Sequence, residues 1–372
     1  MSGNESLARL DPYRVMVWGP GGMGAVAIWE MSQTKAFELV GVRAYSAAKH
    51  GQDVGELLGL PAMGVTASTD VDSLIDIECD CIIYTPRDDG THNADEELLR
   101  LLAAGHNVVT PLPYQSIHLV REAAFVERLE AACRQGRSVF HATGIDPDVI
   151  SDRVLLSLTG MCTDIQSIKL QENWEMESTA GELLTLIGYG KSPEEAQKFT
   201  AAVDIAVPFF KAIGYTVAEQ LGVRYDRVEI THDYIMADTD VPSPNLLVKA
   251  GTVGRVTHRF MGYCDDRGVD PFFTFETNWV LGHEMLPEGI LPDQYWVMSI
   301  EGRPSIKTAI DLKASLASNE RFYQVGNLKT DAGYHATIAP CLQAIPVICR
   351  SEPGILPGFS PKTRWMSDFR SI

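Results

Sequence analysis

The chain has 372 residues, a length typical of two domains. Its formal net charge of -18 repels nucleic acids and anionic membranes and argues against both as general partners. A small anionic ligand remains compatible, because a local cluster of Arg and Lys side chains is enough to bind it. Apolar residues make up 45% of the chain, the usual share for a globular protein with a full core.

The sequence also indicates a compartment. The N-terminal stretch MSGNESLARLDPYR lacks the apolar core of a secretory signal, and no run of about 18 apolar residues predicts a membrane-spanning helix. The seven cysteines are scattered and odd in number, which favours reduced thiols over a zinc site or a set of disulfides. We therefore expect a cytoplasmic protein without a structural metal.

Strands and helices alternate along the first 145 residues. Residues 13–18 predict a strand that leads through a glycine cluster into a helix ending near Met31. Further strands are expected at 37–46, near Val65, and at 79–86, 106–110 and 138–144, with helices at 92–104 and 118–135. Strand and helix at this spacing predict parallel βαβ units and a doubly wound α/β sheet, whose buried strands read as continuous apolar runs.

The pattern changes after Gly144. Helices are expected at about 148–159, 192–213 and 332–349, between longer alternating strands. In FFTFETNWVL, Phe273, Phe275, Trp279 and Leu281 share one face, and Thr274, Glu276 and Asn278 share the other. This alternation predicts a mostly antiparallel sheet with one face toward water or a ligand. The stretches around CDDRGVD and within WVMSIEGRPSIKTAIDL read as hairpins.

The stretch GPGGMG has the spacing of a dinucleotide-binding turn. Gly19 permits the tight turn, Gly21 lets the backbone approach a pyrophosphate, and Gly24 allows the helix to pack on its strand, with Gly22 and Met23 between them. The helix N-terminus then offers free N–H groups to the phosphates. The alternative is a glycine-rich turn that binds nothing.

The second strand indicates which dinucleotide is bound. An acid at its end would bind the ribose 2′-hydroxyl of NAD, but VRAYSAAKHG has no acid before Asp53. Arg43, Ser46 and Lys49 offer donors and positive charge instead. This predicts NADP as the cofactor and makes NAD the less suitable one, although Lys49 is also compatible with a solvated surface position.

The chain resembles the dihydrodipicolinate reductase-like NAD(P)-dependent oxidoreductases, in the branch of 2,4-diaminopentanoate dehydrogenase and the native amine dehydrogenases. The resemblance is carried by GPGGMG, SAAKHGQDVGELLG, DCIIYTP, NVVTP, GIDPDVISDRVLLSLTG, IGYGKSPEEAQ and DAGYHATIAPCLQAIPVICRSEPGI. It implies a Rossmann domain at 1–147, completed by a C-terminal helix within 331–372, and an α+β substrate and dimerisation domain at 148–330. It places the active site between the domains, with cofactor contacts at the strand ends: Thr85, Pro86, Thr110, Pro111 and Gly144.

Three departures from the related families restrict the activity. Dihydrodipicolinate reductases proper carry a histidine pair and a lysine where this chain has GIDPDVISDR. Sugar-dehydrogenase relatives carry Glu-Lys-Pro after the fifth strand, where this chain has NVVTPLPYQ. Amine dehydrogenases carry a glutamate in that stretch, and this chain has Pro113 and Tyr114 there.

The missing glutamate leaves the acid-base group open. Tyr114 stands on a loop stiffened by Pro111 and Pro113 and could donate a proton or orient an iminium ion. Asp146 could replace the lost carboxylate, as could Asp148, although aspartates at such positions also cap helices.

Other side chains are weaker candidates. His141 and Trp174 are candidate substrate contacts, but His141 lies in a buried-looking strand, where most histidines belong to the core. Glu172 and two further glutamates, Glu175 and Glu177, lie beside Trp174. His118 has the position of a helix-starting residue rather than of a catalytic one.

The leading hypothesis is an NADPH-dependent oxidoreductase that reduces C=O or C=N in a small, mostly apolar substrate. The alternatives are an amine dehydrogenase and a non-catalytic NADP-binding sensor, which the lost glutamate would favour. The alternating strands of the second domain leave a face to be covered, so a homodimer through that domain is expected.

Overall fold

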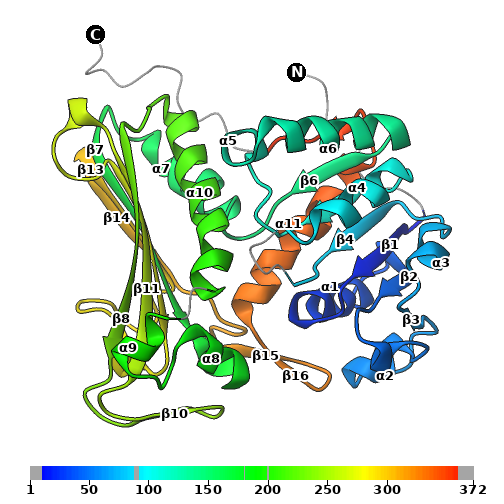
Figure 1. The fold of residues 1–372 in the computed structure, drawn as a ribbon, viewed down its shortest axis with the longest axis horizontal. Coiled ribbons are helices and arrows are strands. Elements are labelled where there is room, and N and C mark those ends of the chain that lie inside the picture. Colours follow the sequence, from blue (N-terminus) through cyan, green and yellow to red (C-terminus); the bar gives the residue numbers. More distant parts are fainter. Residues whose placement is uncertain (1–10, 88–91, 180, 199–200, 359–372) are drawn as a thin grey trace. The chain divides into compact units, whose positions relative to one another are not determined.

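A computed structural model describes residues 11–87, 92–179, 181–198 and 201–358 (Figure 1). The chain forms two compact units. One comprises the described residues before 88 with His92–Ile145 and Ala314–Gly358, and the other comprises the described part of Asp146–Lys313. Residues 1–10, at the start of the N-terminal stretch, and 359–372, expected in the first domain, lie outside the described residues. No described helix is long and apolar enough to cross a membrane.

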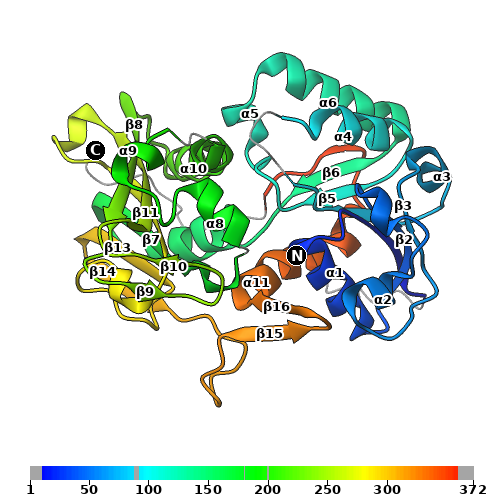
Figure 2. The same ribbon diagram turned by 60° about the horizontal axis from the view of Figure 1, so that its bottom comes forward.

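The first unit is built on a seven-stranded parallel sheet, which confirms the predicted fold class. Its strand order is β17-β6-β5-β4-β1-β2-β3, so the order reverses between β1 and β4. Figure 1 labels β1 and β4, and Figure 2 labels β2, β3, β5 and β6 of the same sheet. The strands are β1 (Tyr13–Trp18), β2 (Phe37–Arg43), β3 (Ala67–Ser68), β4 (Cys81–Tyr84), β5 (Val108–Thr110), β6 (Val139–Ala142) and β17 (Gly354–Ile355). Ligands of such open sheets bind beyond the carboxyl ends of the strands, at the point of reversal.

Helices cover both faces of this sheet. Val15 and Val17 of β1 pack with α1 (Gly22–Ser32) and α11 (Ala332–Ile348), whereas Met16 and Trp18 pack with α4 (Asp95–Ala103) and α6 (Ala123–Gly136). This alternation buries both sides of the strand, as the continuous apolar run predicted. The remaining helices are α2 (Val54–Leu58), α3 (Val71–Ile75) and α5 (Ile117–Val120).

The single helix expected at 118–135 is wrong, because α5 ends at Val120 and α6 begins at Ala123. Arg121 between them has an extended backbone, with φ -115° and ψ 159°. Its guanidinium pairs with Asp95 at 2.5 Å and stacks over the ring of Phe125 at 3.9 Å. We attribute the break to these two contacts.

The second unit contains a six-stranded mixed sheet of order β14-β13-β7-β12-β11-β8. Only β7 and β12 pair in parallel, and both predicted hairpins, β11–β12 and β13–β14, are present. The strands are β7 (Asp164–Glu175), β8 (Arg227–Met236), β11 (Val253–Tyr263), β12 (Phe273–Val280), β13 (Trp296–Arg303) and β14 (Ile306–Ile310). Short pairs are formed by β9 (Val241–Pro242) with β10 (Leu247–Val248) and, in the first unit, by β15 (Phe322–Val325) with β16 (Leu328–Asp331).

One long helix, α10 (Ala201–Leu221), lies against this sheet (Figure 1). The segment expected as one helix at 192–213 is instead α9 (Pro193–Ala196), which begins with a Ser192–Glu195 capping box, followed by α10. The other helices are the π-helical η2 (Val149–Leu155), α7 (Leu156–Thr159) and α8 (Gly181–Ile187). Phe210 of α10 contacts Phe275 of β12, with ring centroids 5.4 Å apart.

The two faces of β12 separate as predicted, but the polar face is not exposed. Glu276 is buried and is contacted by Lys169 at 3.0 Å and Arg259 at 2.6 Å. Asn278, also buried, accepts a hydrogen bond from Thr257 at 2.8 Å and donates one to Asn173 at 3.1 Å. Ion pairs and side-chain hydrogen bonds between neighbouring strands therefore satisfy these buried polar groups within the chain.

A glycine determines how closely α10 packs on the sheet. A Cβ atom at Gly214 would lie 2.2 Å from the ring of Phe260, which is fully buried. We expect Gly214→Ala to lower the free energy of unfolding by about 1–2 kcal/mol, because overpacking outweighs the gain of about 1 kcal/mol in helix propensity. Urea denaturation measures this loss. The double variant Gly214→Ala/Phe260→Leu should recover part of it, and an unchanged Gly214→Ala midpoint would contradict the prediction.

Candidate cofactor site and active site

The turn between β1 and α1 requires glycine at two positions. Gly19 has φ +91°, and a Cβ atom there would lie 2.8 Å from the carbonyl oxygen of Thr85. A Cβ atom at Gly24 would lie 2.2 Å from the carbonyl oxygen of Gly19. At Gly21 nothing lies within 4 Å of the same position, so the backbone there is open to a ligand. This cradle fits the pyrophosphate of a dinucleotide at the N-terminus of α1.

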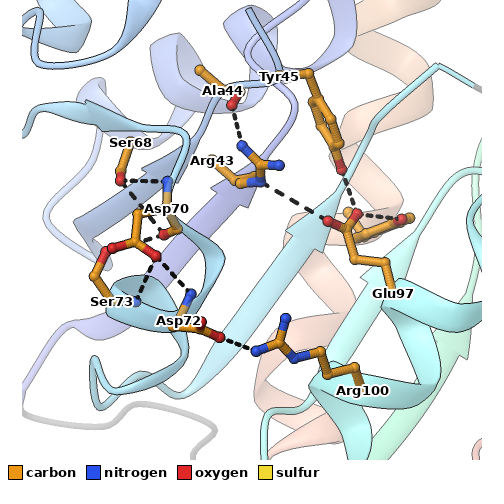
Figure 3. Close-up of polar contacts among 10 residues, drawn as sticks. Arg43, Ala44, Tyr45, Ser68, Asp70, Asp72, Ser73, Glu97 and Arg100 are labelled. Atoms are coloured by element: carbon orange, nitrogen blue, oxygen red, sulfur yellow. Dashed lines mark hydrogen bonds and ion pairs between the residues drawn. The ribbon is translucent and has the colours of Figure 1, made fainter. Parts of the chain in front are cut away.

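The carboxyl end of β2 carries a cluster of charged and phenolic side chains (Figure 3). Arg43 donates a hydrogen bond to the carbonyl of Ala44, and its Nε lies 3.9 Å from Glu97 of α4. Glu97 accepts hydrogen bonds from Tyr45 and, at 2.8 Å, from Tyr84. Burial and the neighbouring Glu97 raise the pKa of the Tyr45 hydroxyl, which therefore acts as a neutral donor. Sequence reasoning missed Glu97, because nothing distinguishes it from the exposed acids of its helix.

Lys49 and Ser46 follow this cluster. The Lys49 amine donates to the carbonyl of Pro20 at 3.2 Å, which places a positive charge beside the glycine turn. Ser46 precedes η1 (Ala47–Lys49), and its side chain makes no capping hydrogen bond. Asp53 instead caps α2, accepting from the amide of Gly55 at 2.8 Å. The first acid after β2 is thus engaged in a helix cap.

The remaining predicted cofactor contacts lie along one edge of the sheet, beyond β4, β5 and β6. The Thr85 hydroxyl donates to the carbonyl of Gly19 at 3.1 Å. The amide of Thr143 donates to the carbonyl of Thr110 at 3.0 Å. A Cβ atom at Gly144 would lie 3.6 Å from the side chain of Pro111. This edge therefore contains the turn after β1 and the ends of three strands. Pro86 follows Thr85 in the chain, and Gly22 and Met23 are the first residues of α1.

Tyr114 lies in the core of the first unit. Its side chain is 4% exposed, and its hydroxyl donates to Asp95 at 2.8 Å. The ring packs edge-on against Phe140, with centroids 5.7 Å apart. These contacts give Tyr114 a packing role, and its proposed catalytic role remains a prediction. His141 is also fully buried, and its Nδ1 lies 3.0 Å from the carbonyl of Leu356, as in a core histidine.

Asp146 differs from the other acids near it. Both of its carboxylate oxygens are buried, and neither forms a hydrogen bond with a residue that the structure describes. Burial raises the pKa of Asp146 well above its ordinary value, and the charges of Glu172 and Asp152 raise it further, whereas the nearby hydroxyl of Ser151, which donates to Asp152 at 2.7 Å, lowers it. Asp148, the second candidate, is instead paired with Arg153 at 2.6 Å. Asp146 is therefore a buried carboxyl that retains its proton to higher pH than usual.

Glu172 and Trp174 lie on the same face of β7. The Trp174 ring contacts Trp279 edge-on, with centroids 6.1 Å apart, so the carboxylate of Glu172 has an aromatic pair beside it along the strand. Burial also raises the pKa of Asp152 to about 7. The second unit thus presents an acidic group and aromatic surface, a combination suited to a cationic or iminium ligand.

Two family models match segments of the chain. Residues 13–107 match the family described as dihydrodipicolinate reductase, N-terminus, and residues 149–315 match the 2,4-diaminopentanoate dehydrogenase C-terminal domain. The chain is an NAD(P)-dependent oxidoreductase.

Two curated relatives of this oxidoreductase align over nearly all of its length. The chain is 26% identical to an amine dehydrogenase from Streptomyces virginiae, over 91% of this chain and 93% of that protein. It is 22% identical to 2,4-diaminopentanoate dehydrogenase from Acetoanaerobium sticklandii, over 93% and 92%. The predicted family resemblance is confirmed.

Solved structures share the fold. An amine dehydrogenase from Mycobacterium smegmatis superposes with a TM-score of 0.73 at 20% identity, covering 96% of this chain and 98% of that one. A scyllo-inositol dehydrogenase from Lactobacillus casei, solved with NAD(H) and scyllo-inositol, superposes with a TM-score of 0.53 at 12% identity, covering 91% and 88%.

The contacts of Tyr114 predict the effect of removing its hydroxyl. We expect Tyr114→Phe to lower the free energy of unfolding by about 1–2 kcal/mol, since a partly buried bond to a carboxylate is lost while Asp95 keeps Arg121. Turnover should change less than about threefold, well short of the loss on removing a general acid. Tyr263→Phe, which loses a bond to the half-exposed Glu229, is the control and should cost less. A fall in turnover of 100-fold or more would instead support the catalytic role predicted from the sequence.

Proposed function

We propose that this oxidoreductase catalyses the reductive amination of a small ketone or aldehyde, and the reverse oxidation of the amine. The observation that carries the proposal is the buried carboxyl of Asp146, whose two oxygens accept no hydrogen bond from a described residue and which lies within the electrostatic reach of Glu172. The two full-length relatives, named for amine and diaminopentanoate dehydrogenation, support the same chemistry.

The reaction consumes carbonyl compound, ammonia, one proton and the reduced dinucleotide, and yields amine, water and the oxidised dinucleotide. A bound nicotinamide dinucleotide supplies the hydride in this direction and accepts it in the other. The residues of the chain must bind ammonia, protonate the hydroxyl that leaves as water, and stabilise the iminium cation. A carboxyl group performs all three tasks, as proton donor when neutral and as counter-ion when charged.

Asp146 suits these tasks for electrostatic reasons. Its raised pKa keeps a proton available near neutral pH, which an ordinary aspartate would have lost. When Asp146 gives up that proton, an iminium ion serves as the counter-ion of the buried carboxylate. Asp146 thereby takes the place of the glutamate that related enzymes carry after the fifth strand.

A carbonyl reductase that does not use ammonia is the second candidate, and Pro113 and Tyr114 in place of that glutamate favour it. Initial rates of NADPH oxidation with a panel of apolar ketones, with and without ammonium, separate the two. Reductive amination requires product amine and dependence on ammonium. An alcohol formed at the same rate without ammonium would establish the second candidate.

Replacing Asp146 tests its role. We expect Asp146→Asn to lower kcat for amination by roughly 10²–10⁴-fold, with the affinity for NADPH unchanged. The wild-type rate should fall as pH rises through the elevated pKa of Asp146, because the neutral carboxyl is the donor, and the variant should lack this fall.

Asp148→Asn is the matched control for this experiment. Its carboxylate faces Arg153, so the substitution should reduce stability more than turnover. If Asp146→Asn retains full turnover on a substrate of the wild type, Asp146 is not the acid.

We also propose that NADP is the preferred cofactor, bound at least about 10-fold more tightly than NAD, a difference of about 1.4 kcal/mol. The Lys49 amine at the glycine turn and the Arg43 guanidinium supply positive charge for a 2′-phosphate. Calorimetric titration of both cofactors measures the ratio. Lys49→Ala should reduce it, whereas Lys35→Ala, which removes an exposed lysine of the same unit, should not.

Glu97 should oppose this preference, since it partly neutralises Arg43. We expect Glu97→Gln to strengthen NADP binding relative to NAD in the same titrations. Glu96→Gln is its control, because Glu96 lies on the same helix but pairs with the exposed Arg128 at 2.7 Å. Equal or tighter binding of NAD by the wild type would contradict the NADP assignment.

The proposed organisation of the protein assigns the dinucleotide to the first unit and the substrate to the second unit, through which two copies associate as a cytoplasmic homodimer.

A further inference from the structure

Four polar side chains form a row across the sheet of the second unit. In the strand register, His232 of β8 lies opposite His258 of β11, which lies opposite Thr277 of β12, which lies opposite Glu172 of β7. Phe210 of α10 contacts the ring of His258 at 5.7 Å. The row, called here the polar row, therefore lies on the face of the sheet that α10 covers.

Aromatic and aliphatic side chains flank the polar row on both sides along the strands. One neighbouring row contains Val256, Trp279 and Trp174, and the other contains Phe260, Phe275 and Leu170. Within this apolar surrounding His258 is 0% exposed and Thr277 is 2% exposed. Polar groups in such a place destabilise the fold unless they are hydrogen-bonded.

Two atoms of the polar row have no such bond. The Nε2 atom of His258 and the hydroxyl of Thr277 are buried, and neither has a hydrogen-bond partner among the residues that the structure describes. On the opposite face of the same strands, the equally buried Thr257 bonds to Asn278 at 2.8 Å. Valine at position 277 would fill the same space without the cost of about 1–3 kcal/mol for an unsatisfied group.

The protonation of the two histidines determines what the row can bind. The Nδ1 atoms of His232 and His258 lie 2.5 Å apart, so one ring donates and the other accepts. Burial and the neighbouring His232 lower the pKa of His258 to about 3, so its ring is neutral. Its Nε2 atom then donates or accepts according to the tautomer, and the Thr277 hydroxyl can do either.

The charges on the strands that form the polar row disfavour an anionic ligand there. The only Lys and Arg side chains of β7, β11 and β12 are Lys169, Arg255 and Arg259, which project from the other face. Glu172 stands at one end of the row. A carboxylate or phosphate would thus meet a negative charge and no cation from these strands. An ammonium group only donates, so it would fit only the tautomer in which His258 Nε2 accepts. A hydroxyl both donates and accepts, so it can satisfy the two partnerless atoms in either tautomer.

We propose that His258 and Thr277 bind a hydroxyl group of the substrate, separate from the carbon that exchanges hydride. The substrate class is then an amino alcohol and its hydroxy ketone, with a small apolar body between the two groups. This assignment of the substrate rests on the proposed amine dehydrogenation.

A matched pair of variants tests the row without any substrate. Thr277→Val and Thr257→Val each remove one buried hydroxyl, from opposite faces of neighbouring strands. We expect Thr277→Val to leave the melting temperature of the ligand-free protein unchanged or higher, and Thr257→Val to lower it by several degrees. An equal loss in both variants would show that the Thr277 hydroxyl has a protein partner, and would overturn the proposal.

Kinetics of amine oxidation test the ligand. The probes are 2-aminopropan-1-ol, 3-aminobutan-1-ol and 4-aminopentan-1-ol, each compared with the amine that carries a methyl group in place of the hydroxyl. For the best of the three lengths we expect kcat/KM at least about 10-fold above that of its methyl counterpart. Thr277→Val should abolish this preference, and Thr257→Val should preserve it.

The outcomes distinguish this proposal from the proposed function. If the methyl amines are oxidised as well as the amino alcohols, or if 1,4-diaminopentane or 4-aminopentanoate is preferred, the hydroxyl site is refuted while amine dehydrogenation stands. If no amine is oxidised, amine dehydrogenation is refuted. The hydroxyl site is then decided by whether 4-aminopentan-1-ol raises the melting temperature of the wild type and not of Thr277→Val.

Discussion

The close contact between residues 19 and 24 is the constraint on which the dinucleotide site depends. The carbonyl oxygen of Gly19 occupies the position that a side chain at residue 24 would fill, so α1 can begin directly after β1 only with glycine at both ends of the turn. The same turn is tied to β4 by the hydroxyl of Thr85. It aims the free amides at the start of α1 toward the edge where the strand order reverses, and the predicted cofactor contacts of the other strands lie along that edge.

Pairing decides which acidic groups of the molecule remain available for chemistry. Asp95 is held by Arg121 and Tyr114, Asp148 by Arg153, and Asp53 by the amides of a helix cap. Asp146 has none of these partners among the described residues, and burial shifts its protonation equilibrium. A protein with a net charge of -18 thus contains many carboxylates, of which few are placed to exchange protons with a ligand.

The two faces of the sheet in the second unit differ in how their buried polar side chains are hydrogen-bonded. On one face, ion pairs and amides on adjacent strands satisfy each other, and a buried glutamate lies between a lysine and an arginine. On the face beneath α10, a polar row is enclosed by aromatic rings and left partly unsatisfied. Since both faces are made by the same strands, the difference reflects the side chains placed there and not the backbone.

The sequence by itself determined the fold class, the glycine turn, both hairpins of the second unit and the family, because these depend on local pattern and spacing. It also predicted Asp146 and Asp148 as candidate replacements for the missing glutamate, after Tyr114, through their position after the sixth strand. Only the tertiary structure decided which side chains have partners. Arg43 is shared with Glu97 from a distant helix, Tyr114 is bonded to Asp95, and the helix expected at 118–135 is interrupted where Arg121 reaches the same acid. Such contacts join residues 19 to 54 positions apart, and no periodicity in the chain encodes them. The polar row arises in the same way, since strand register alone brings Glu172, Thr277 and His258 side by side.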